Sequence, residues 1–312
     1  MGLFISNFSA VATLLVIGIL GFWLLSKRIL IGNVLPPLSA LTIDIALPCL
    51  IFTNITYSFE PQQTPLWWTM PLWWLAFTAL VWIMTMTFSF ISSRNNRREF
   101  RLSLFFQNGI FFPLAIIVEM FGSQSSYLVD LFLFTLFYPA FFFNTAPLFF
   151  GKHSGIRLKR ILNPVLVATL LAIAIRLAGL NQWIPLFVSS GLKLVGAMTV
   201  PLLMIILGGN IFIDFERQGR LFLAETLKFV ALKNMVFPLI VLVLLLLVRP
   251  VFHVALIIIL QSAVPPITAV PIITEREGGN RSIVNQFMVA SFFASLISLP
   301  VIMMLFGFFF SP

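Results

Sequence analysis

The stretch FFQNGIFFPLAIIVEMFG, Phe105–Gly122, predicts a membrane helix that is interrupted inside the bilayer. It is apolar and long enough to cross a membrane, yet its first half contains Gln107, Asn108 and Gly109, and Pro113 stands near its centre. Proline removes a backbone donor, and a carbonyl freed in lipid needs a partner inside the protein or in a water-filled cavity. A break beside two side-chain amides indicates a site, and a plain proline kink in a packing helix is the simpler alternative.

The composition is that of a polytopic helical membrane protein. Hydrophobic residues form 60% of the 312 residues and charged residues only 9%, whereas soluble domains contain about 25% charged residues. The net charge of +9 comes from basic residues between apolar spans, and no soluble basic domain is present to bind nucleic acid. The single cysteine, Cys49, allows no intramolecular disulfide.

Ten apolar stretches are long enough to span a bilayer: residues 3–26, 35–57, 66–91, 102–121, 127–150, 163–180, 184–211, 221–248, 253–274 and 283–310. Most of the 19 Lys and Arg residues lie in the loops after odd-numbered spans. The positive-inside rule therefore predicts that these loops are cytoplasmic and that both termini lie outside the cytoplasm. We expect a multi-pass protein of the plasma membrane, which in a bacterium is the inner membrane.

The chain divides into two halves of five spans around a short basic segment. We expect a first five-helix repeat over residues 1–150, a cytoplasmic linker over 151–162 and a second, inverted repeat over 163–312. Three proline pairs share a spacing of 153 residues: Pro48 with Pro201, Pro113 with Pro266, and Pro147 with Pro300. The same spacing places Asn108 and Gly109 opposite Gln261 and Ser262.

The ninth span is the counterpart of the opening stretch. It reads LQSAVPPITAVPIITEREGG, and Pro265, Pro266 and Pro271 make an uninterrupted helix unfavourable. Two broken helices at matching places in two halves are typical of a transporter binding site. The first N–H groups of a half-helix favour anions, and Asn and Gln supply donors and acceptors to a carboxylate or to water.

Five segments resemble the auxin efflux carrier family: ALPCLIF (46–52), QNGIFFPL (107–114), VPLLMIILGGNI (200–211), LKNMVFPL (232–239) and SAVPPITAV (262–270). That family includes plant auxin exporters and bacterial permeases, and it belongs with the bile-acid sodium symporter-like transporters. The resemblance covers nearly the whole chain. It implies an all-α fold of ten transmembrane helices in two inverted five-helix repeats, with fourth and ninth helices that unwind and cross near the midplane.

The resemblance also implies a substrate site at the crossover. Together with Gln261 from the pattern above, the expected site residues are Asn108, Gly109, Pro113, Gln261, Ser262, Pro265 and Pro266. Family substrates are mostly organic anions, including malate, malonate and auxin, moved by an elevator-like shift of a core domain. The short linker, Gln107 and the Phe111–Phe112 pair depart from the family pattern, so auxin specificity is not carried over.

Ionisable groups inside spans are functional candidates. Asp44 and Gln107 are candidates for coupling transport to H⁺ or Na⁺. The structural alternative for Asp44 is a place in a hydrated crevice, or a hydrogen bond that caps a neighbouring group. We expect Lys228 and Lys233 to reach the interface, with Lys228 beside Glu225.

Two further groups of charged residues have other expected places. Glu119 and Asp130 are expected in solvent near an outer loop. Arg176 and Lys193 lie inside apolar runs and could attract an anion from outside.

The pattern favours a secondary active transporter of a small organic anion, such as a mono- or dicarboxylate, with elevator-type alternating access. No HExxH, GxSxG or Walker motif occurs, so we expect no enzyme, no cofactor and no metal. The alternative is a membrane receptor or scaffold that binds a ligand without moving it. Expected partners are the anion, H⁺ or Na⁺ and membrane lipid; a homodimer is left open, and nucleic acid is excluded.

Overall fold

The computed structural model describes residues 2–62, 65–123, 125–151, 163–216 and 221–310, so most of the expected linker lies outside the described residues. The described helices are α1 (Gly2–Ser26), α2 (Leu35–Leu41), α3 (Leu47–Ser58), α4 (Met70–Phe88), α5 (Arg97–Phe105), α6 (Phe111–Phe121), α7 (Ser126–Phe134), α8 (Tyr138–Thr145), α9 (Pro164–Leu177), α10 (Leu186–Ala197), α11 (Thr199–Glu216), α12 (Leu223–Ala231), α13 (Phe237–Val248), α14 (Phe252–Ala263), α15 (Val270–Arg276) and α16 (Arg281–Phe309). Short 3₁₀ or π-helical turns extend or join several of them, among them η2 (Thr42–Ala46), η5 (Ala146–Phe150) and η8 (Leu232–Val236).

Six helical runs in the described part of the chain are long and apolar enough to cross a membrane: Gly32–Ser58, Trp67–Ile91, Ser126–Phe150, Leu186–Ile213, Leu223–Val248 and Arg281–Phe309. Shorter apolar helices occupy the other expected spans: Val11–Ser26, Phe111–Phe121, Pro164–Leu177 and Phe252–Ala263. The all-helical, multi-pass class is thereby confirmed. The count of ten spans, the division into inverted repeats and the orientation of the termini stay predictions.

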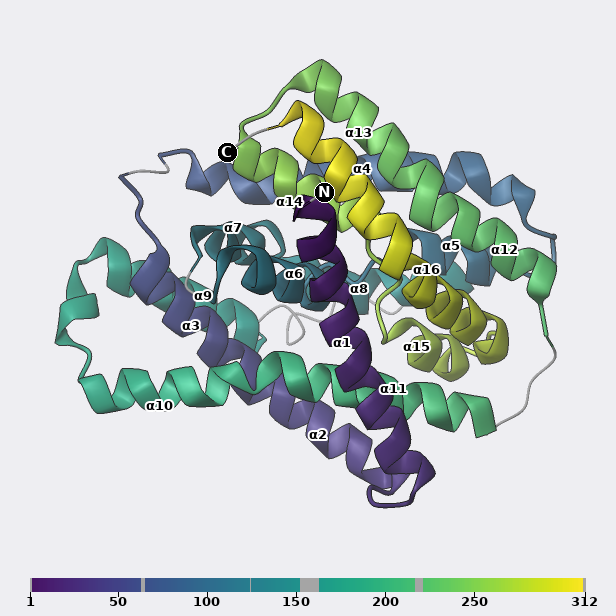
Figure 1. The fold of residues 1–312 in the computed structure, drawn as a ribbon, viewed down its shortest axis with the longest axis horizontal. Helices are drawn as coiled ribbons and strands as arrows, with labels where there is room; N and C mark the ends of the chain where they lie inside the picture. The colour runs from purple at the N-terminus through teal and green to yellow at the C-terminus, as the bar shows by residue number, and fades with distance from the viewer. Residues whose placement is uncertain (1, 63–64, 124, 152–162, 217–220, 311–312) are drawn as a thin grey trace.

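The N-terminal helix α1 crosses the face of the molecule over α11 and also packs against α16 (Figure 1). Glycines allow the two backbones to touch. A Cβ atom at Gly208 of α11 would collide with the carbonyl oxygen of Gly18, and one at Gly21 would collide with the carbonyl of Ile205. Small residues commonly bring membrane helices this close, because packing rather than water exclusion drives their association.

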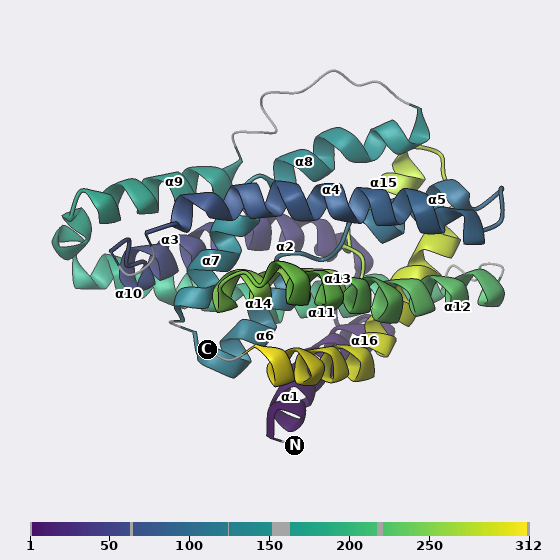
Figure 2. The ribbon, with the colours of Figure 1, turned by 90° about the horizontal axis from the view of Figure 1, so that it is seen from above.

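Two groups of helices flank a buried centre. On one side α3 packs between α9 and α10, and on the other lie α12, α13, α15 and α16 (Figures 1 and 2). The broken pairs α5–α6 and α14–α15 run into the space between them, and every residue of α14 from Val254 to Ala263 is buried. This position puts both breaks inside protein, where freed backbone groups can find partners.

The predicted interruption of the fourth span is confirmed, but it does not fall at Pro113. Helix α5 ends at Phe105 and α6 begins at Phe111, so Pro113 is the third residue of α6. Proline is tolerated in a first turn because its missing N–H would have no intrahelical partner there.

The spacing of 153 residues inferred from the prolines does not align the two breaks. Helix α6 begins at residue 111 and α15 at residue 270, a spacing of 159 residues. Pro113 lies inside a helix, whereas its sequence counterpart Pro266 lies in the unwound segment before α15. Prolines can stand on either side of a helix start, so they locate a break only to within about a turn.

The contact between α1 and α11 predicts that alanine is destabilising at one glycine and tolerated at another. Gly208→Ala should lower the free energy of unfolding by about 1–3 kcal/mol, since the added methyl meets the backbone of α1. Gly191→Ala on α10 is the control, because a Cβ there meets no atom within 4 Å. Thermal unfolding in detergent measures both, and a Gly208→Ala variant as stable as the Gly191→Ala variant would contradict the packing described.

Candidate functional site: a helix crossover and its cavity

The unwound segments 106–110 and 264–269 meet and pair through their backbones. The amide of Asn108 donates to the carbonyl of Pro265 at 2.8 Å, and the amide of Ile267 donates to the carbonyl of Phe106 at 3.0 Å. Gln107 and Pro266 form an isolated antiparallel bridge. Each break thus satisfies part of the other's backbone, which neither could do with lipid as its neighbour.

Side chains satisfy two more backbone carbonyls at this crossover. Gln261 Nε2 donates to the carbonyl of Gly109 at 2.5 Å, and the hydroxyl of Tyr138 donates to the carbonyl of Gln107. A Cβ atom at Gly109 would lie 2.5 Å from Gln261 Oε1, so a larger residue here would displace the side chain of Gln261. The crossover is therefore held by α14 and α8 as well as by the two breaks themselves.

Several polar groups at the crossover keep unused hydrogen-bonding capacity. Asn108 Oδ1 and Gln107 Oε1 are buried and have no hydrogen-bond partner among the described residues, with 2% and 3% of the two residues exposed. The first amides of α6, those of Phe111 and Phe112, donate to no acceptor in the described part of the chain. Buried polar groups are normally paired, so these atoms indicate a place for water or a polar ligand.

A cavity of about 370 Å³ opens beside Asn108. Its lining is formed by Ser39, Ile43, Asn108, Phe111, Phe143, Pro147, Leu203, Met204, Ile206, Asn210, Thr268, Ala269, Ile272, Ile273, Arg276 and Glu277. The volume is within the usual range for small-molecule sites, about 300–1,000 Å³. An apolar lining with a few amides, hydroxyls and one guanidinium suits a small ligand that carries negative charge.

The cavity has two walls from different parts of the chain. Ser39 and Ile43 come from α2 and η2, and Asn210 comes from α11. The facing wall consists of the crossover, with Asn108, together with α8, η5 and α15. A ligand in this cavity would contact both walls at once.

The sequence-predicted residues divide into three groups. Asn108 lines the cavity, whereas Gly109, Gln261, Pro265 and Pro266 build the crossover behind it. Pro113 is buried in α6, and the hydroxyl of Ser262 donates to the carbonyl of Ile259 in its own helix at 2.7 Å. Asp44 is exposed on η2 and does not line the cavity, although its neighbour Ile43 does.

Sequence reasoning missed five polar residues of the lining: Ser39, Asn210, Thr268, Arg276 and Glu277. The sequence pattern placed Arg276 only among the basic residues of a cytoplasmic loop, but in the structure it is the last residue of the half-helix α15. Ser39 stands four residues before Ile43, so helical spacing puts both on one face, and that signal was available in the sequence.

Two charged groups lie deeper than expected. Asp130 is only 5% exposed in α7, and Lys233 is 1% exposed in η8, so the predicted solvent and interface positions are wrong. The ammonium of Lys233 lies 5.9 Å from the ring centroid of Phe237, a face that attracts cations. The expected pair is confirmed, with Lys228 Nζ 3.0 Å from Glu225 Oε1.

Fold and site together define a polytopic helical membrane protein with two broken helices that cross beside a small, mostly apolar cavity. A family model described as membrane transport protein matches residues 6–156 and again residues 152–303. The chain therefore belongs to this family of membrane transporters, which confirms the resemblance to the auxin efflux carriers. No curated protein matches the chain.

The crossover predicts unequal effects for two neighbours on α14. Gln261→Leu should lower the free energy of unfolding by about 1–3 kcal/mol, because the buried carbonyl of Gly109 loses its donor. Ser262→Ala should cost about 1 kcal/mol or less, since its hydroxyl only repeats a bond within its own helix. Chemical or thermal unfolding in detergent compares the two, and equal stability of both variants would argue against the cross-helix role of Gln261.

Proposed function

We propose that this chain is a secondary active transporter of a small organic anion, such as a mono- or dicarboxylate. The observation that carries the proposal is the unpaired, buried Asn108 Oδ1 beside a cavity that also contains Arg276. An anionic carboxylate can accept from the guanidinium of Arg276, from side-chain amides and from the open amides of α6. A protonated carboxyl group or a hydroxyl on the same molecule can donate to Asn108 Oδ1.

The lining contains one cation, Arg276, and one carboxylate, Glu277, and the guanidinium of Arg276 supports an anionic ligand. Arg276 has no ion-pair or hydrogen-bond partner among the described residues, whereas Glu277 in the same lining has an interaction of its own. A guanidinium without an ion-pair partner is the side chain that binds carboxylates best, because its donors form a planar fork.

The two-walled construction supports elevator-type movement. The wall of the crossover, α8 and α15 would shift against the wall of α2 and α11 and carry the ligand from one side of the membrane to the other. Broken helices of this kind are common at transporter sites because the site can move as one unit with its half-helices. We propose that a proton or sodium gradient drives transport. The alternative is facilitated export of the anion without coupling to an ion.

The alternative function is a receptor or scaffold that binds the anion without moving it. Reconstitution into proteoliposomes separates the two functions. We expect saturable uptake of labelled malate, malonate or indole-3-acetate that responds to an imposed proton or sodium gradient. Binding of an anion to the folded protein without any flux would favour the receptor.

Asn108→Ala should impair transport without unfolding the protein. Removing an amide that bonds a charged ligand costs about 1.5–3 kcal/mol, so the KM for the anion should rise about 10-fold to 100-fold. Asn33→Ala, at an exposed position of the short 3₁₀ helix Gly32–Val34, is the matched control. Initial uptake rates measure both variants, and unchanged kinetics in Asn108→Ala would remove this residue from the site.

Arg276→Gln should weaken transport of anions more than any surface charge change does. The guanidinium is the one cation in the described cavity lining, so its loss should raise the KM at least about 10-fold. Lys27→Gln removes an exposed charge that is not part of this lining and should leave the KM unchanged. Equal uptake by the two variants would contradict the role given to Arg276.

A further inference from the structure

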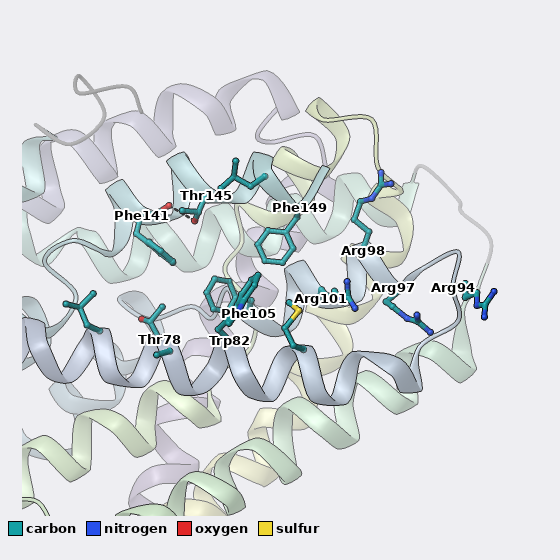
Figure 3. A pocket seen from close by; sticks show the side chains of 14 residues that line it. Thr78, Trp82, Arg94, Arg97, Arg98, Arg101, Phe105, Phe141, Thr145 and Phe149 are labelled. Atoms are coloured by element: carbon teal, nitrogen blue, oxygen red, sulfur yellow. Dashed lines mark hydrogen bonds between the residues drawn. The ribbon is translucent and has the colours of Figure 1, made fainter. Parts of the chain in front are cut away.

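A second cavity, of about 840 Å³, lies along α4, α5 and α8 and shares no lining residue with the crossover cavity (Figure 3). One end is basic, with the side chains of Arg94, Arg97, Arg98 and Arg101. The other end is apolar and aromatic, and Figure 3 shows Trp82, Phe105, Phe141 and Phe149 gathered there. The cavity therefore matches the polarity of an amphiphilic ligand, with one charged end and one apolar end.

The four arginines have no carboxylate partner among the described residues. Arg101 Nε donates to Ser89 Oγ at 2.8 Å, and Arg97 Nη2 donates to the carbonyl of Ser92 at 3.4 Å, both neutral acceptors. The guanidinium carbon of Arg97 lies 5.1 Å from the ring centroid of Phe90, and that of Arg98 lies 5.7 Å from the ring centroid of Phe150. These contacts orient the guanidinium groups but leave their charge uncompensated.

The only acid on α5 does not neutralise this cluster. Glu99 is 6% exposed, and its Oε1 accepts from the amide of Asn280 at 3.0 Å, at the start of α16. Four positive charges within a short loop and the first two turns of a helix repel one another, and a bound anion would relieve that repulsion.

The apolar end belongs to the membrane. Its wall includes Leu75 and Trp82 of the candidate span Trp67–Ile91, and these side chains are 54% and 44% exposed. Large apolar side chains exposed on a membrane span normally face acyl chains. The basic end lies where that span ends, the depth at which arginines meet lipid headgroups.

We propose that this cavity binds one anionic phospholipid from the leaflet on the side of the basic loops. Its phosphate lies among the guanidinium groups of Arg97, Arg98 and Arg101, and an acyl chain lies along Trp82, Phe105 and Phe149. Arginine is the side chain best suited to a phosphate, because it presents paired donors. The volume of the cavity and its apolar walls fit a ligand with an acyl chain. Charge complementarity and apolar contact can therefore act on the same molecule.

Tryptophan fluorescence tests the proposal in the full chain in detergent micelles. Phosphatidylglycerol with brominated acyl chains should quench Trp82 in a saturable step, and Trp82→Phe should remove most of that step. Brominated phosphatidylcholine should need a severalfold higher mole fraction. Each arginine charge that is removed should raise the mole fraction of phosphatidylglycerol at half-saturation about fivefold. The double variant Arg97→Gln/Arg98→Gln should therefore raise it about 25-fold.

Three controls keep the result interpretable. Arg97→Lys/Arg98→Lys keeps both charges and should retain most of the binding, and Lys27→Gln should behave as the unmodified protein. Ala79→Phe fills the apolar end and should block the step even where the arginines are intact. Equal quenching by both lipids, or an unchanged half-saturation in the double Gln variant, overturns the proposal. Competition by soluble glycerol phosphate as strong as that by the lipid would also overturn it, since the site would then bind a free anion.

Discussion

Every backbone polar group inside a membrane needs a hydrogen-bond partner, and the structure depends on this constraint. Two helices stop inside the protein, and the groups that they free are paired by each other, by Gln261 and by Tyr138. Without the second break, the amide of Asn108 and the carbonyl of Phe106 would lack the partners they now have. The same constraint explains the site. Among the described residues, the crossover leaves Asn108 Oδ1 without a partner, and Asn108 lines the cavity, where it can bind a ligand.

The residues that line the cavity belong to helices that are held by different contacts. Helices α1 and α11 touch backbone to backbone at Gly18 and Gly208, so the wall that contains Asn210 is tied to the N-terminal helix. The crossover wall is tied instead to α8 and α14 by side-chain hydrogen bonds to Gln107 and Gly109. In the elevator mechanism that we propose, one wall would move against the other and carry a ligand between them across the membrane.

The sequence was sufficient for the membrane class, the two breaks and the nearness of Asn108 and Gln261 to the crossover, since prolines and side-chain amides are costly inside an apolar span and mark a break or a site. It misplaced the register of the breaks because Pro113 is tolerated inside the first turn of α6. It also missed Asn210 and Arg276, which reach the cavity only through the packing of distant helices. The burial of Asp130 could not be read from its position near an expected loop, because burial depends on the helices that pack around α7. The assignment of Asp44 to ion coupling stays a prediction.

The central claim is that the crossover cavity opens in turn to the two sides of the membrane, and cysteine accessibility tests it most directly. Cys49 is the only native cysteine, so Cys49→Ala with Thr268→Cys places a single thiol in the unwound segment that lines the cavity. In sealed proteoliposomes of known orientation, a membrane-impermeant maleimide should label this thiol from either side, and a transported anion should slow the labelling from both. Labelling from one side alone, under every imposed gradient and with or without anion, would contradict the account.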